Sequence, residues 1–166
     1  MKWIFKIFAI TYASTLFAAD NCDLFTNPES CLGRTPEALS GVQYSVRDGV
    51  SRTRWERLDL ADDEKKNIQM LYVNNRDNPF GLAIEISAYR NVIFHIRIPN
   101  ASERFPLSQE DFELFKDIIK RTKTPESWTS KGSGYRRYEN YDNGDVRIVL
   151  FYNAVVMNSR ALGPPR

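Results

Sequence analysis

Apolar and polar residues alternate along residues 81–99, with one interruption at residues 89–91. A period of two is typical of a β-strand that buries one face, so the pattern predicts two strands joined by a short loop. The apolar positions share one face only if the strands pair in an even register, and a three-residue loop, Tyr89-Arg90-Asn91, provides that register. We therefore expect a β-hairpin over residues 81–99 in which Glu85 lies opposite His95.

Two turn signals predict two further hairpins. Asp48-Gly49 is typical of a two-residue type I′ turn and predicts a hairpin over residues 42–58. Asn143-Gly144 predicts a third hairpin over residues 135–157. The second strand of this third hairpin begins at Val146 and is apolar at nearly every position, which indicates a strand covered on both faces.

Two segments have the apolar spacing of a helix. Residues 59–75 carry acidic residues near their start, which suit the positive end of a helix dipole, although residues 68–73 also fit a strand. Residues 108–121 form the stronger prediction, because Ser108 can cap the first turn and Asp111 stands three positions later. Apolar side chains recur on one face of this second helix, as expected for a helix that packs on a sheet.

The order hairpin, helix, hairpin, helix, hairpin predicts an α+β fold, in which an antiparallel sheet built from three β-hairpins carries two amphipathic helices on one face. We expect one domain over residues 42–158, followed by a polar tail over residues 159–166. The inward-facing large side chains form the predicted core: Val42, Tyr44, Val46, Trp55, Ile84, Ile86, Phe94, Ile96, Phe112, Phe115, Ile119, Ile148 and Leu150.

The first 19 residues have the features of a secretory signal peptide. Lys2 and Lys6 give a positive start, residues 7–16 are mostly apolar and uncharged, and small residues end the segment at Ala19. The uncharged stretch is shorter than the roughly 20 residues that a spanning helix needs. We expect cleavage after Ala18 or Ala19 and a secreted or periplasmic mature protein without a membrane span.

The chain has two cysteines, Cys22 and Cys31, both in an irregular segment over residues 20–41. In an oxidising compartment a disulfide between them is expected. The spacing is longer than that of a redox-active Cys-x-x-Cys pair, so the bridge is interpreted as structural. Because both cysteines precede the first predicted strand, we expect the bridge to stabilise residues 20–41 outside the core.

Composition narrows the classes of function. With 42% hydrophobic and 27% charged residues, the chain of 166 residues is one globular unit rather than a disordered segment. Loss of the signal peptide removes two of the 23 basic residues and leaves 21 basic against 21 acidic ones. A neutral protein lacks the charge that nucleic-acid binding normally requires. A single histidine and two cysteines exclude two-histidine and four-thiolate metal motifs, and we expect neither metal nor cofactor.

The first functional hypothesis is a secreted or periplasmic, non-catalytic binding protein of the inhibitor or toxin-neutralising type. Arg47, Arg52 and Arg54 share the polar face of the first predicted hairpin. This face is either a solvated sheet surface or a recognition surface for another protein with an acidic surface. Tyr138 belongs to a tyrosine series that fits neither strand nor helix spacing and is a further candidate for the binding surface.

The alternative hypothesis is a small secreted ribonuclease-like phosphodiesterase, with nucleic acid as its substrate. Its chemistry needs a base, an acid and a cation, which Glu85, His95 and Arg97 respectively can supply on the polar face of the predicted 81–99 hairpin. The same residues are also interpreted as a cross-strand ion pair worth some tenths of a kcal/mol. Neutral charge and the lack of a catalytic motif favour the binding protein.

Overall fold

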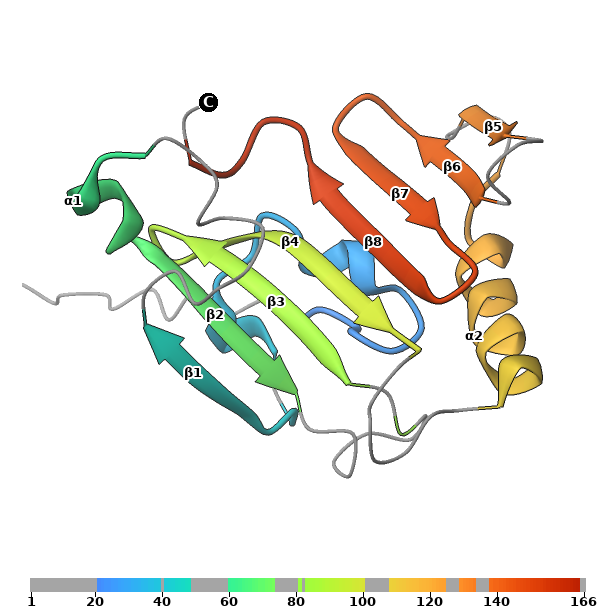
Figure 1. The fold of residues 1–166 in the computed structure, drawn as a ribbon, viewed down its shortest axis with the longest axis horizontal. Coiled ribbons are helices and arrows are strands. Elements are labelled where there is room, and N and C mark those ends of the chain that lie inside the picture. Colours follow the sequence, from blue (N-terminus) through green and yellow to red (C-terminus); the bar gives the residue numbers. More distant parts are fainter. Residues whose placement is uncertain are drawn as a thin grey trace, which may run out of the picture.

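The structure is a computed structural model that describes residues 21–39, 41–48, 60–73, 81, 83–100, 108–124, 129–133 and 138–164. Eight antiparallel strands form one sheet in the order β1-β2-β3-β4-β8-β7-β6-β5 (Figure 1). The strands are β1 (Tyr44–Asp48), β2 (Ile68–Val73), β3 (Ile84–Tyr89), β4 (Val92–Pro99), β5 (Thr129–Ser133), β6 (Tyr138–Asp142), β7 (Val146–Leu150) and β8 (Ala154–Ser159). The helices are α1 (Asp62–Lys65) and α2 (Gln109–Arg121), with two 3-10 turns, η1 (Pro28–Cys31) and η2 (Pro36–Ala38).

This architecture, an antiparallel sheet with few helices, is consistent with the predicted α+β class, but the first predicted helix is wrong. In the described part of this segment, residues 60–73, only the single turn α1 is helical, and after a two-residue turn β2 begins at Ile68, as the alternative of a strand over residues 68–73 had it. Ile68 and Met70 are buried on one face of β2, whereas Leu71 and Val73 are buried on the other. Apolar residues on both faces of a short strand reproduce helical spacing, which explains the error.

The first predicted hairpin is not tested, because its second strand lies outside the described residues. In the structure β1 pairs with β2, with Val46 opposite Leu71. Val46 is 50% exposed, so its assignment to the core is wrong; among the described strands, β1 stands at one end of the sheet order. The proposed partner strand, which includes Arg52, Arg54 and Trp55, lies outside the described residues.

The hairpin of β3 and β4 is confirmed, but its loop and register differ from the prediction. The turn has two residues, Arg90 and Asn91, both with positive φ as in a type I′ turn. A two-residue turn produces an odd register. If this register continued along the hairpin, apolar residues would lie opposite polar ones. A register shift between Ser87 and Ala88 restores the even register, so that Ile86 lies opposite Ile96.

The third predicted hairpin corresponds to β6 and β7, and its turn at Asn143-Gly144 is confirmed. The Asn143 side chain accepts the backbone N–H groups of residues 145 and 146. The predicted second strand, however, is two strands: β7 ends at Leu150, and the chain turns back through residues 151–153 into β8, which pairs with both β7 and β4. Buried side chains lie on both faces of these strands, as expected.

One face of the sheet carries the main core. Two elements cover it: α2, and the N-terminal segment of residues 22–39, seen behind the sheet in Figure 1. The helix begins as predicted, because Ser108 Oγ accepts the backbone N–H of Asp111 at 3.1 Å. The fully buried or nearly buried core comprises Leu24, Cys31, Leu39, Leu71, Val73, Ile84, Ile86, Ala88, Ile93, Ile96, Ile98, Phe112, Phe115, Ile119, Ile148, Leu150, Val155 and Met157. Of the other predicted members, Val42 and Tyr44 pack partly buried against it, and Phe94 is buried outside this cluster.

Polar contacts attach α2 to β6 at the rim of this core. Lys120 Nζ lies 2.8 Å from Glu139 Oε1, and the Tyr141 hydroxyl donates to Glu139 Oε2 at 2.8 Å. Burial, and then the hydrogen bond to Glu139, raise the pKa of Tyr141 to about 12. Burial raises the pKa of Glu139, but its contacts with Lys120 and Tyr141 outweigh this effect and hold that pKa below its usual value.

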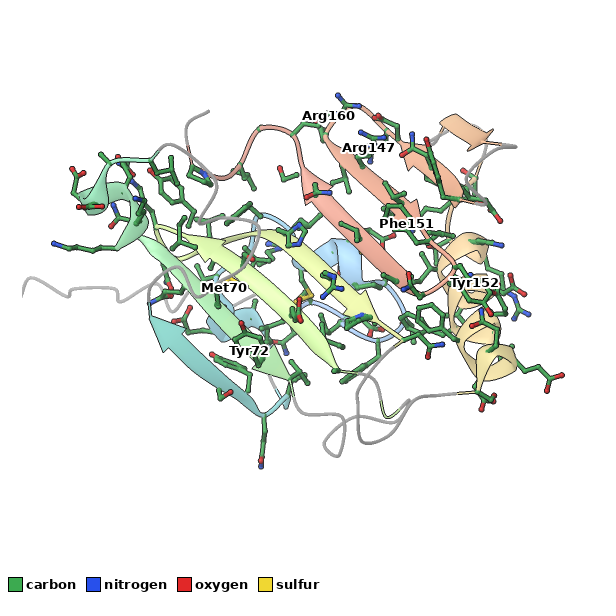
Figure 2. The ribbon with its side chains drawn as sticks, in the orientation of Figure 1. Met70, Tyr72, Arg147, Phe151, Tyr152 and Arg160 are labelled. Carbon is green, nitrogen blue, oxygen red and sulfur yellow. A yellow bond between two sulfur atoms is a disulfide. The ribbon has the colours of Figure 1, made fainter. Side chains whose placement is uncertain are left out.

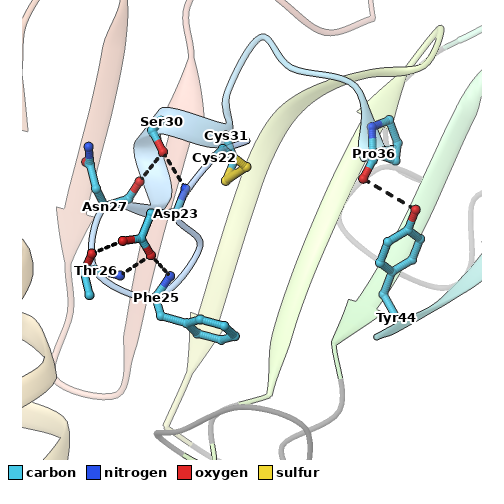
Figure 3. The surroundings of a disulfide bond; sticks show 9 residues. All are labelled: Cys22, Asp23, Phe25, Thr26, Asn27, Ser30, Cys31, Pro36 and Tyr44. Carbon is cyan, nitrogen blue, oxygen red and sulfur yellow. Dashed lines mark hydrogen bonds between the residues drawn. A yellow bond between two sulfur atoms is a disulfide. The ribbon is translucent and has the colours of Figure 1, made fainter. Parts of the chain in front are cut away.

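The predicted disulfide between Cys22 and Cys31 is present, with a Cα–Cα distance of 5.0 Å (Figure 3). Its position differs from the prediction, because Cys31 is fully buried in the main core. Within the loop, the Asp23 carboxylate accepts the backbone N–H groups of Phe25 and Thr26 at 3.0 and 2.9 Å. The bridge therefore shapes a segment that is itself part of the core.

The N-terminal segment also forms hydrogen bonds with the start of β4, before the residues that pair with β8. Gly33 N donates to Ile93 O at 2.8 Å, and Ile93 N donates to Arg34 O at 2.8 Å. Elsewhere in the segment, Glu29 forms an ion pair with Lys123, just beyond α2. The segment is thus joined both to β4 and to the end of α2.

Candidate functional site

The face of the sheet opposite the main core, here called the outer face, carries most of the residues with candidate chemistry. Cross-strand neighbours share a face, so the register places two rows of residues on it. One row runs through Tyr72, Glu85, Arg97, Val156, Val149 and Asn140. The next runs through Met70, Ser87, His95, Asn158, Arg147 and Asp142. Figure 2 views the molecule from this side.

The predicted cluster of Glu85, His95 and Arg97 is brought to one face, but not in the predicted register. Arg97 lies opposite Glu85, and Arg97 Nη1 is 2.8 Å from Glu85 Oε2. His95 lies opposite Ser87, so the expected position of Glu85 across from His95 is wrong. The two-residue turn and the register shift each move the pairing by one residue, so beyond the shift every partner lies two residues from the predicted one.

His95 has a buried polar environment. Its side chain is only 6% exposed, and Nδ1 is 2.7 Å from Asn158 Oδ1. An amide oxygen only accepts hydrogen bonds, so Nδ1 carries the proton. A general acid must come within about 3 Å of its substrate, and this burial gives a substrate little access to the imidazole. The catalytic role of Glu85, His95 and Arg97 stays a prediction.

The predicted binding arginines are only partly placed by the structure. Arg47 is on β1 opposite Met70, a register position in the same row as His95. The placement of Arg52 and Arg54 lies outside the described residues. Tyr138, the predicted binding tyrosine, begins β6 and is half-buried.

A pair of arginines on the outer face was not singled out from the sequence. Arg147 lies opposite Asp142, and Arg160 forms an ion pair with the same carboxylate. Arg147 Nε donates to Asn140 Oδ1 at 3.0 Å. The backbone N–H of Gly144, and then Arg160, hold the pKa of Asp142 below its usual value. Both guanidinium groups remain exposed, so a single carboxylate is flanked by two positive charges at the surface.

Aromatic side chains form the other end of this surface. Phe151 is 38% exposed and Tyr152 59% exposed, at the turn between β7 and β8. The ring of Tyr138 lies 5.8 Å from that of Phe151, centroid to centroid. Figure 2 shows Phe151 and Tyr152 near α2, away from Arg147 and Arg160. The sequence missed this exposure because the prediction ran one strand through the turn.

Two hydrogen bonds fix the turn that carries these rings. The carbonyl of Phe151 accepts from Lys116 Nζ at 3.2 Å, and the carbonyl of Tyr152 accepts from Gln109 Nε2 at 3.3 Å. Both donors belong to α2. The exposed rings are therefore presented on a turn tied to a packed helix, which lowers the conformational entropy lost when a partner binds.

Within the described ranges, no group of three His, Cys, Asp or Glu residues is arranged to hold a metal ion. The helices of the described part include none long and apolar enough to cross a membrane. Comparisons of the chain with protein-family models, curated proteins and solved structures found no match.

Proposed function

We propose that the protein is a secreted or periplasmic, non-catalytic binding protein of the inhibitor or neutralising type, whose partner is a protein with an acidic surface. The observation that carries the proposal is the joint exposure of Arg147 and Arg160 on the outer face and of Phe151 and Tyr152 at the turn between β7 and β8. Aromatic residues and arginine are the types enriched at protein interfaces and among their energetic hot spots.

The state of the polar residues also supports binding rather than catalysis. Glu85 and Arg97 neutralise one another, and the Nδ1–H of the buried His95 is used by Asn158. A catalytic acid and base instead need access to the substrate. The exposed groups on this face are donors and apolar rings, which suit recognition.

The disulfide supports the compartment. A disulfide such as Cys22–Cys31 is typical of proteins outside the reducing cytosol, and it fits an extracellular or periplasmic protein. Location in such a compartment fits a protein that binds another protein in the same compartment. The predicted signal peptide belongs to the same proposal.

The test starts from the tagged mature chain as bait in an extract of its own compartment. The retrieved protein is purified, and its affinity for the bait is measured by calorimetry. We expect Tyr152→Ala and Arg147→Ala each to weaken binding about 10- to 30-fold, as for interface hot spots. Val46→Ala is the matched control, since Val46 is also an exposed side chain, at 50% against 59% for Tyr152, but lies on β1, at the far end of the order of described strands.

Less than a twofold change is expected for Val46→Ala. Equal losses for all three variants would contradict recognition through the outer face of β6 to β8. Failure to retrieve any protein that binds the purified chain would contradict the function itself.

A further inference from the structure

We infer that the outer face of the β6–β7 hairpin binds one extended, acidic segment of a polypeptide, with a carboxylate at one end and an apolar side chain at the other. The inference rests on the proposed function and specifies its partner. We assign a single occupant to this surface, on the basis of the charged groups and rings at the two ends of the hairpin.

The spacing of the two ends comes from the strand register. Asp142 lies opposite Arg147, and Asn140 lies opposite Val149. The next position on the same face carries the Tyr138 and Phe151 rings, which are in contact. Residues on one face of an antiparallel strand are about 6.8 Å apart, so the two ends are roughly 14 Å apart. This length equals four residues of an extended peptide.

The arginine end suits one additional carboxylate. Arg147 and Arg160 flank Asp142 and expose both guanidinium groups, with Asp145 in the same turn. The bond from Arg147 Nε to Asn140 uses one of the five N–H donors of that guanidinium. A carboxylate of the partner can therefore pair with an arginine whose position is already fixed, which makes the interaction stronger than one with a freely rotating side chain.

The opposite end accepts an apolar group. Tyr152 and Phe151 expose their rings there. The two charged groups beside the rings form an ion pair, because Glu113 Oε1 lies 2.6 Å from Lys116 Nζ. The arginines at one end and the rings at the other set the direction in which the segment lies.

Between the two ends, the hairpin strands β6 and β7 themselves contribute no charge to the outer face, and Lys131 of β5 stands opposite Asn140. The position between the ends consists of Asn140, which is half-buried, and Val149, which is buried. A nucleic acid carries a negative charge at every residue and would match only the arginine end. A polypeptide with one acidic and one apolar side chain matches both ends, and this is why we assign the surface to a protein segment.

The probes are synthetic nonapeptides of Gly and Ser that carry one Tyr and one Asp, separated by two, four or six positions. Each is titrated into the full disulfide-bonded mature chain, and amide chemical shifts are followed by NMR, which detects millimolar binding. We expect the four-position peptide to bind at least fivefold more tightly than the other two. Its shifts should map to β6, β7 and the turn at residues 151–153.

Variants test the assignment of the ends. In the unchanged protein, replacing the Asp of the peptide by Asn should weaken binding at least fivefold. In the Arg147→Gln variant, the same replacement in the peptide should have no effect on binding. Arg90→Gln is the control, since Arg90 is an exposed arginine at the β3–β4 turn. It should leave this fivefold preference unchanged, and the amide spectrum shows whether each variant is folded.

Three results would overturn the inference: equal affinity for all spacings, shifts confined to another face, or tighter binding of a nine-residue uridine oligonucleotide than of any peptide. None of them alone rejects the proposed function. A retrieved protein whose affinity still depends on Tyr152 would keep that function and reject only the extended acidic segment.

Discussion

Glu85 faces Arg97 across the β3–β4 ladder, with Arg97 Nη1 2.8 Å from Glu85 Oε2, and the pair lies one position along from His95 on the same face. Without the bulge, the two-residue turn of the hairpin would not have placed Glu85 opposite Arg97. The bulge that corrects the register therefore decides both the core and the polar contacts of the outer face.

A double-mutant cycle on this pair should give a small coupling energy. Both side chains are partly exposed, so we expect Glu85→Gln and Arg97→Gln to couple by about 0.2–1 kcal/mol in urea unfolding. The same cycle between Glu85 and His95, with His95→Gln, should give a smaller coupling. A larger coupling with His95 than with Arg97 would mean that the hairpin adopts the originally expected register.

Phe115→Ala should destabilise the protein by about 3–5 kcal/mol, because the ring is fully buried between α2 and the sheet and its loss leaves a cavity. Leu114→Ala is the control on the adjacent residue, which is 57% exposed, and it should change stability by less than about 0.5 kcal/mol. Chemical unfolding of both variants measures the difference. Equal costs would show that the helix presents a different face to the sheet.

Loss of the disulfide should affect the core as well as the loop. We expect the double variant Cys22→Ala, Cys31→Ala to lose about 2–3 kcal/mol of stability on the chain-entropy model. Because Gly33 and Arg34 bond to Ile93, the protection of the Ile93 amide from hydrogen exchange should fall in that variant. Unchanged protection at Ile93, with fast exchange limited to residues 22–39, would support the original expectation of a bridge outside the core.

Alkaline pH should destabilise the protein partly through Tyr141. In the folded state its pKa is raised to about 12, whereas a tyrosine in the unfolded chain has its usual value of about 10. Between these values the unfolded state binds fewer protons than the folded state, so stability is lost as pH rises through this interval. Urea unfolding at several pH values should show a smaller loss for Tyr141→Phe than for the unchanged chain, and a loss of equal size would exclude Tyr141 as a source.

The protein should not cleave RNA above the background rate. His95 is buried and its Nδ1–H is held by Asn158, so we expect a fluorogenic RNA substrate to remain intact with the unchanged protein and with His95→Gln. The control is a known ribonuclease under the same conditions. Cleavage that collapses in His95→Gln while thermal unfolding is unchanged would establish the phosphodiesterase hypothesis.

Local patterns predicted much of the fold. Ser108 and Asp111 mark the start of α2, and Asn143-Gly144 marks the turn of the β6–β7 hairpin, because capping and turn geometry depend on neighbouring residues. The disulfide was predictable from the presence of only two cysteines. These features need no knowledge of distant contacts.

The features that sequence patterns missed depend on tertiary contacts. In β2, burial on both faces imitates a helix, and only its pairing with β1 and β3 decides between the two. The surface with Arg147, Arg160 and Tyr152 was missed for a similar reason. Its residues belong to two adjacent strands and a turn, and an apolar run that continues through Phe151 hides where the chain reverses.

The position of the N-terminal segment has a consequence for the order of folding. This segment is synthesised before the strands of the sheet, yet Glu29 contacts Lys123, 94 residues later in the chain, and Gly33 contacts Ile93. Contacts between residues so distant in sequence form slowly, because a long stretch of chain must be ordered before they are made. The cysteines, by contrast, are separated by nine positions, so their loop can close early. We expect the closed loop to dock last, onto a sheet that the rest of the chain has already assembled.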